Sequence, residues 1–219
     1  MNKLFLTLLF FPLLSFSQEK TNDSKIDFGF YVLPEMNGLT TANPVGTETA
    51  RSKFGFSAGL NLEYRLTPKI SFRTGLGYGL KNYNHLHEGL IFNSDISPLD
   101  GIQTVSRMES SISYSELQLP LLFQYKLNPK VFFTLGLELN TSFADKSERF
   151  IYYGNGAIDQ LENTNGAILN YAPMLSIGFL VPNSNFIIEP LFKYNIKEYL
   201  IPMSNQYNYG LKITYNLGL

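Results

Sequence analysis

The fold is decided by residues 113–143, SYSELQLPLLFQYKLNPKVFFTLGLELNTSF. Every odd-numbered residue from Leu117 to Leu127 is large and apolar, whereas the residues between them are mostly polar. After Asn128-Pro129-Lys130 the odd positions from Val131 to Leu139 are again apolar, and the alternate positions are mixed, small or charged. Alternation with a period of two indicates strands with one apolar face. The stretch therefore predicts a β-hairpin with a tight turn.

The same unit repeats along the chain and predicts eight strands. Short turns are expected at 67–69, 128–130 and 182–185, with a connection of intermediate length at 197–205 and long loops at 35–52, 82–112 and 144–168. An even number of antiparallel strands, with short turns at one end and long loops at the other, is typical of outer-membrane barrels. We predict an all-β, eight-stranded antiparallel transmembrane β-barrel with short periplasmic turns and long extracellular loops. The predicted strands are 26–34, 53–66, 70–81, 113–127, 131–143, 169–181, 186–196 and 209–219.

The residues opposite the apolar face favour a membrane barrel over a soluble one. They include many glycines, as expected where side chains must fit a narrow interior. Several tyrosines on the apolar face lie near strand ends, where an interfacial girdle belongs. Strands of about 11–13 residues also suffice to cross a bilayer at a tilt. A soluble exported barrel or sandwich, with its apolar faces turned inward, remains the alternative at this point.

Charges of both signs lie on the small-residue face, where they can neutralise one another inside a barrel, because a lone buried charge is costly. Asp27, Lys53 and Lys81 lie on this face too. We expect a structural salt-bridge network that fills the lumen. Its predicted members are Glu63, Arg65, Arg73, Glu116, Lys126, Glu138, Glu189, Lys193 and Lys212.

Composition limits the other classes of function. Only 16% of the 219 residues are charged, against about 25% in ordinary soluble domains. Cysteine is absent, which excludes disulfides, thiol chemistry and a lipid-anchoring cysteine. The formal net charge is −1, so no basic surface argues for nucleic acid. No cofactor is expected.

The first 17 residues have the features of a secretory signal peptide. A short basic start is followed by an apolar run over residues 4–14, and Ser15-Phe16-Ser17 places small residues before Gln18. We predict cleavage there, leaving residues 18–219 as the barrel domain. The alternative, an N-terminal anchor helix, is disfavoured because the run is too short to span a bilayer. We expect the mature chain to be a monomer in the outer membrane, surrounded by its lipid.

The segment Tyr114-Ser115-Glu116-Leu117-Gln118-Leu119-Pro120-Leu121-Leu122-Phe123-Gln124-Tyr125-Lys126-Leu127 resembles a strand motif of a known family. In the outer-membrane β-barrel domain family of Bacteroidota, often called PorT-like or porin family proteins, the strand reads Tyr-x-Glu-Ile-Pro-Leu-Leu-x-Lys-Tyr. This chain has two more residues between Glu116 and Pro120 than that form. The resemblance implies a membrane barrel and no catalytic residues. One branch of the family takes part in protein secretion.

Two histidines provide the only cluster with metal-binding or general-base character. His85 and His87 lie two residues apart, so in an extended segment both would face the same way, with Glu88 beside them. Two ligands are too few for a metal site, and solvated loop histidines are the simpler reading. A loop-edge histidine with Ser94, Asp95, Ser97 or Glu88 would suit a lipid-modifying enzyme, but no catalytic signature orders them.

The functional prediction follows by elimination. Long loops in compact proteins are usually functional or disordered. We therefore expect a structural, adhesive or partner-binding protein that acts through its extracellular loops and not an enzyme, with a protein as the partner. A narrow porin for small solutes is the first alternative, and a lipid-modifying enzyme is the second.

Overall fold

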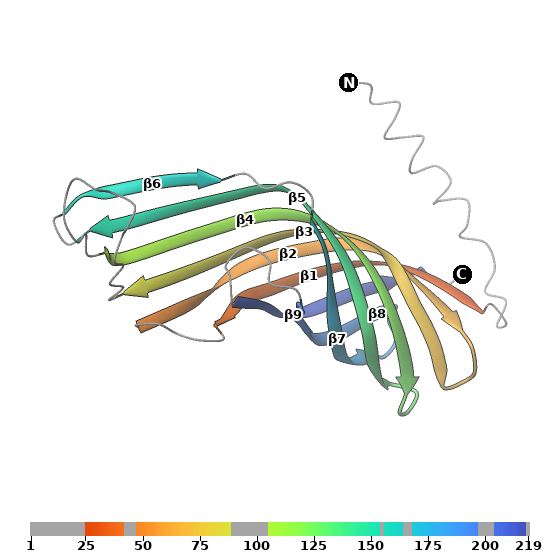
Figure 1. Ribbon diagram of the computed structural model, residues 1–219. Coiled ribbons are helices and arrows are strands. Elements are labelled where there is room, and N and C mark those ends of the chain that lie inside the picture. The colour runs from red at the N-terminus through yellow and green to blue at the C-terminus, as the bar shows by residue number, and fades with distance from the viewer. Residues whose placement is uncertain are drawn as a thin grey trace, which may run out of the picture.

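The computed structural model describes residues 25–41, 47–88, 105–153, 156–163, 168–196 and 204–217 (Figure 1). The predicted signal peptide lies outside these ranges, as do Ser94, Asp95 and Ser97. No helix in the described ranges is long and apolar enough to cross a membrane. The strands are β1 (Ile26–Thr41), β2 (Thr47–Arg65), β3 (Ile70–Glu88), β4 (Val105–Lys126), β5 (Val131–Tyr153), β6 (Ile158–Asn163), β7 (Ile168–Leu180), β8 (Phe186–Tyr194) and β9 (Ser204–Asn216).

Eight of these strands close into an antiparallel ring, in the order β1-β2-β3-β4-β5-β7-β8-β9 and back to β1. The eight-stranded barrel is therefore confirmed. Successive side chains of each strand point alternately out of the ring and into it. The cross-strand neighbours Phe30, Leu60 and Leu76 point outward, whereas Asn61 and Arg73 point inward. Strand β6 is not part of the ring and pairs with the outer end of β5.

The three short turns form where the sequence predicts them. At each, the backbone closes from one strand to the next, as in the bond from Leu127 N–H to Val131 C=O at 2.9 Å. The Asn128 side chain accepts from the N–H groups of Lys130 and Val131, which fixes the turn before β5. Asn183 supplies the left-handed residue of the turn before β8, with φ 56°. All three turns lie at one end of the ring, which is the periplasmic end.

The prediction of long loops is wrong for much of their length. Residues 35–41 and 47–52 continue β1 and β2, residues 82–88 and 105–112 continue β3 and β4, and residues 144–153 continue β5. These continuations show little apolar alternation because outside a bilayer both faces of a strand can be polar. The outer ends 47–52, 83–88, 105–112 and 147–153 form, with β6, one sheet that extends beyond the barrel (Figure 1). We call it the projecting sheet.

The outward face of the ring is apolar and exposed. Leu60, Leu76 and Leu135 are 50%, 56% and 53% exposed, although they lie in mid-strand. Outward aromatic residues meet near the periplasmic end, as in the Phe186–Tyr215 pair at 5.0 Å, and towards the outer end, as in the Tyr78–Phe143 pair at 6.0 Å. Apolar residues outside and polar residues inside are the arrangement of a membrane barrel. The soluble alternative, which needs the faces reversed, is wrong.

One seam of the ring is weaker than the rest. Strands β7 and β8 pair in two short pieces, 174–176 with 191–193 and 179–180 with 187–188. Pro190, which has no N–H group to give to a ladder, lies in the interruption. By contrast, β4 and β5 pair along almost their whole lengths.

Candidate functional site

The lumen is filled by layers of side chains, and the layer nearest the periplasm is built on Arg73. The two terminal guanidinium nitrogens of Arg73, Nη1 and Nη2, each donate to the carboxylate of Glu189 at 3.0 Å, and Nη1 also donates to Gln124 at 3.2 Å. Ser176 donates to the same carboxylate. The Arg73 guanidinium lies 5.5 Å from the ring centre of Phe132. Arg73 and Glu189 are buried, so the pair is closed off from water.

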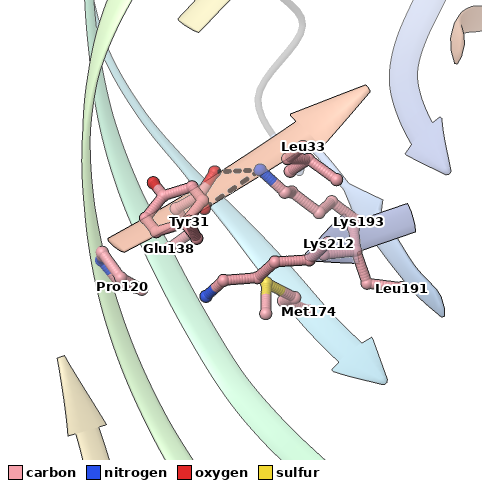
Figure 2. Close-up of a pocket in the computed structure, with 8 residues that line it drawn as sticks. All are labelled: Tyr31, Leu33, Pro120, Glu138, Met174, Leu191, Lys193 and Lys212. Carbon is pink, nitrogen blue, oxygen red and sulfur yellow. Dashed lines mark hydrogen bonds and ion pairs between the residues drawn. The ribbon is translucent and has the colours of Figure 1, made fainter. Parts of the chain in front are cut away.

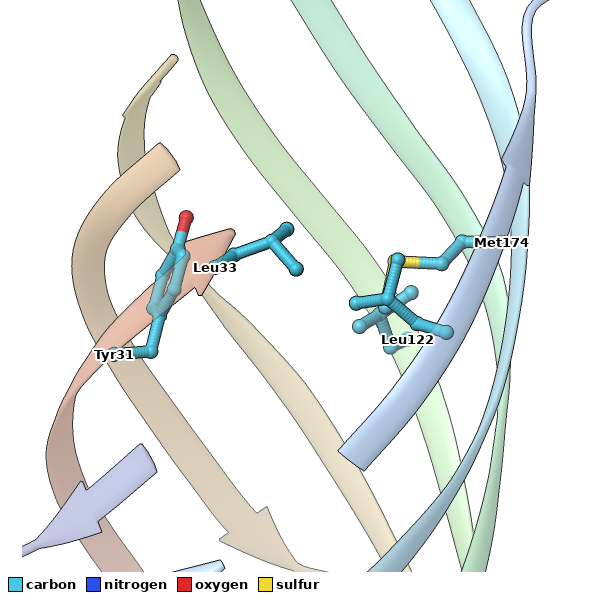
Figure 3. Packing of buried hydrophobic residues seen from close by; sticks show 5 residues of the cluster. Tyr31, Leu33, Leu122 and Met174 are labelled. Atoms are coloured by element: carbon cyan, nitrogen blue, oxygen red, sulfur yellow. The ribbon is translucent and has the colours of Figure 1, made fainter. Parts of the chain in front are cut away.

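An apolar layer crosses the middle of the lumen. Tyr31, Leu33, Leu122, Met174 and Leu191 are all buried and form one cluster (Figure 3). The Tyr31 ring fits beside β2 and β3 because glycines leave room for it there: a Cβ atom added to Gly77 would lie 2.0 Å from the Tyr31 hydroxyl oxygen. The glycines predicted to line a narrow interior thus make room for a large ring.

Two lysines lie at the edge of this apolar layer (Figure 2). Lys193 Nζ donates to both carboxylate oxygens of Glu138, at 2.8 and 3.0 Å. Lys212 Nζ lies 4.3 Å from the ring centre of Tyr31. The space left between these side chains has a volume of about 10 Å³, enough for roughly one water molecule. The middle of the barrel is therefore closed.

A third layer lies towards the outer end and is centred on Lys81. Its ammonium forms ion pairs with Glu35 and, at 3.3 Å, with Glu116. Ser57 and Gln118 complete the network: Ser57 donates to Glu35 at 2.9 Å, and Gln118 donates to Glu116 at 2.7 Å. All five side chains are buried. One ammonium between two carboxylates compensates charges that could not be buried alone.

A layer of tyrosines and amides closes the outer end. The rings of Tyr83 and Tyr114 stack with centres 5.9 Å apart. The Tyr114 hydroxyl donates to Gln206 at 3.0 Å, and Asn208 donates to the Tyr83 hydroxyl at 3.0 Å and to Asn37. This layer joins β1, β3, β4 and β9, so it fixes the point where the projecting sheet leaves the ring.

The projecting sheet is held by cross-strand contacts of its own. The Arg107 guanidinium in β4 lies 5.5 Å from the ring centre of Tyr152 in β5, and it is oriented within β4 by a hydrogen bond to Glu109 at 3.2 Å. The hydroxyl of Tyr153 donates to Asp159 at 2.8 Å, joining β5 to β6, and this bond raises the pKa of Tyr153. The contacts are polar and largely exposed, as expected for strands in water.

The sequence itself matches the family model of the outer membrane protein beta-barrel domain over residues 16–198. The chain belongs to this family. Its barrel therefore lies in the outer membrane. The narrower resemblance to PorT-like proteins of Bacteroidota stays a prediction.

Two solved structures show a distant similarity to this chain. Neisserial surface protein A is 10% identical with a TM-score of 0.43, and the match covers 86% of this chain and 96% of that one. Ail, the attachment invasion locus protein of Yersinia pestis, is 9% identical with a TM-score of 0.45, covering 88% and 99%. These similarities are too low to transfer a function. None of the curated proteins matches the sequence.

In this outer membrane beta-barrel domain, the predicted charges separate into two groups. Most of the predicted set lies buried in the layers described above. Arg65 lies instead at the periplasmic mouth, where its Nη2 pairs with Asp27 at 2.7 Å, and Lys126 lines the same mouth. Glu63 is buried there and accepts from Gln124 at 3.2 Å. The residues inside are Arg73, Glu116, Glu138, Glu189, Lys193 and Lys212.

Sequence reasoning missed Glu35 and misplaced His85. Both were assigned to loops, whereas Glu35 lies in β1 and His85 in β3. His85 is buried, on the same face as Tyr83, and therefore is not at a solvated loop edge. If the alternation of β1 is continued past residue 34, Glu35 points inward, on the same face of the strand as Tyr31 and Leu33. The described residues contain no group of three or more ligands that could hold a metal ion.

Proposed function

We propose that this barrel is a non-enzymatic anchor that presents the projecting sheet to a partner outside the cell, in an adhesive or partner-binding role. One observation carries the proposal: strands continue as a paired sheet well past the apolar belt. Strand β4 has 22 residues and β5 has 23, whereas a spanning strand needs about 9–11. The additional length adds nothing to membrane insertion, so it serves the outside.

The filled lumen supports this proposal over the narrow porin. Ion pairs and apolar side chains cross it in successive layers, and the space at its middle has room for about one water molecule. In planar bilayers we expect the purified barrel to produce no stable channels above the baseline current. Stable unitary conductance from the folded, heat-modifiable form would instead support the porin.

Removal of the β5–β6 hairpin tests the adhesive role. Deletion of residues 147–163 leaves the last barrel pair, Ser142 with Ile168, joined by residues 143–146 and 164–167. We expect cells that display the full chain to adhere to immobilised extracellular proteins or to one another, and cells that display this variant to lose that adherence. The barrel layers stay intact, so the variant should still show a heat-dependent shift in gel mobility. Unchanged adherence with the hairpin removed would contradict the proposal.

A lipid-modifying enzyme finds less support. The sequence prediction placed the histidine of such an enzyme at a solvated loop edge, whereas the His85 side chain is buried on the inward face of β3. We therefore expect lipid analysis to find no modified lipid in membranes that contain the full chain. Membranes that contain the His85→Ala variant should give the same result.

A further inference from the structure

A cavity opens at the periplasmic mouth of the barrel, at the end opposite to the projecting sheet. Its volume is about 210 Å³. It is bordered by Ser184 and Asn185 from the turn before β8 and by Asp27 and Asn216 near the two ends of the barrel chain. This cavity is far larger than the space in the middle of the lumen.

The cavity is blind because Phe132 closes its inner end. Phe132 is fully buried and lies beneath the Arg73 guanidinium. Its ring lies against β7 at Gly178, where an added Cβ atom would be 1.9 Å from the ring. A solute that enters from the periplasm therefore meets a wall and cannot pass through. The cavity has the form of a binding site and not of a channel entrance.

Two further charges line the cavity, Glu63 and Lys126, and neither forms a close ion pair among the described residues. Arg65 and Asp27 neutralise each other across 2.7 Å. Glu63 is only 5% exposed, and one of its carboxylate oxygens accepts from Gln124. Neither Glu63 nor Lys126 belongs to any of the ion pairs formed among the described residues. Arg73 lies opposite Glu63 in the β2–β3 pairing, but both of its terminal nitrogens donate to Glu189, so the charge of the buried Glu63 carboxylate is only partly compensated.

The size and charge of the cavity together define the ligand. Sites for drug-sized molecules have volumes of about 300–1,000 Å³, so this one suits a smaller solute. The Glu63 carboxylate and the Lys126 ammonium, which form no close ion pair, match a molecule that carries one positive and one negative charge. Phe132, Leu180 and Ile187 supply an apolar surface beside them.

We propose that the periplasmic cavity binds a small zwitterion of the α-amino acid class. The ligand's ammonium group meets Glu63, its carboxylate meets Lys126, and its side chain lies on the apolar wall. This site is independent of the projecting sheet, so either proposal can fail without the other.

Titration of L-alanine into the isotope-labelled full chain in detergent micelles tests the site, since both ends of the barrel are then open to solvent. We expect saturable amide shifts at residues 124–126 and 184–187. Propionate and isopropylamine, which each keep one of the two charges, should bind about tenfold more weakly or worse. Equal binding of all three, or shifts that do not saturate, would overturn the proposal.

Variants separate the two charges of the site. Glu63→Gln and Lys126→Met should each weaken alanine binding by about tenfold or more. Lys130→Met is the matched control, because Lys130 lies in the turn before β5, at the same end of the barrel, and does not line the cavity. All three should keep the heat-dependent gel shift. Alanine binding that survives in folded Glu63→Gln and Lys126→Met would show that the charges do not form the site.

Discussion

Arg73→Met is expected to destabilise the barrel by about 3–5 kcal/mol, the usual cost of leaving one member of a buried ion pair without the other. The substitution leaves Glu189, whose side chain is 0% exposed, without its two guanidinium hydrogen bonds. Unfolding by urea in lipid vesicles, followed by gel mobility without boiling, measures the loss.

Two further variants show that burial decides this effect. Arg73→Met with Glu189→Leu should recover most of the stability, because a matched apolar pair can replace a buried ion pair. Arg107→Met breaks the Arg107–Glu109 pair in the projecting sheet, where Arg107 is 45% exposed, and should cost at most about 1 kcal/mol. Similar losses for Arg73→Met and Arg107→Met would mean that the lumen is wet.

Leu60→Arg is expected to cost about 2–4 kcal/mol in lipid, the range for a cation on the lipid face near the bilayer midplane. Leu60 is 50% exposed, and its neighbours across the sheet, Phe30 and Leu76, are exposed and apolar too. The same unfolding measurement in vesicles applies.

Ile158→Arg is the matched control for the bilayer. Ile158 is 58% exposed, also apolar and also in a strand, but it lies in β6, outside the ring. Its replacement should change the free energy of unfolding by no more than about 0.5 kcal/mol. If both variants lost the same stability, the bilayer would not be the cause, and the position of the apolar belt would be wrong.

The apolar belt could be predicted from the sequence because a bilayer imposes a strict rule on it. Outward residues within the belt are apolar with few exceptions, such as Thr74, so a strand such as 117–127 has an apolar residue at every second position. The turns follow from local chemistry, as at Asn128 and Asn183. Pairing of the eight strands then follows from their order, because each short turn joins neighbours.

The projecting sheet could not be predicted because water imposes no such rule. Residues 47–52 read Thr-Glu-Thr-Ala-Arg-Ser, which has no apolar face, yet they pair with β3 along their length. The same reason explains His85, which lies inward in a strand that the pattern ended at residue 81. The individual ion pairs could not be predicted from the sequence either, because partners such as Arg73 in β3 and Glu189 in β8 come from strands that are not neighbours.

The interrupted seam between β7 and β8 has a mechanical consequence. A closed ring under load opens at its weakest bonded edge, and this edge has only two short runs of pairs around Pro190. Met174 and Leu191, which lie on the two sides of it, also belong to the apolar layer of the lumen. Lateral tension in the bilayer would therefore separate β7 from β8 first. At this seam the side-chain packing inside the ring contributes more to closure than the hydrogen bonds between the strands.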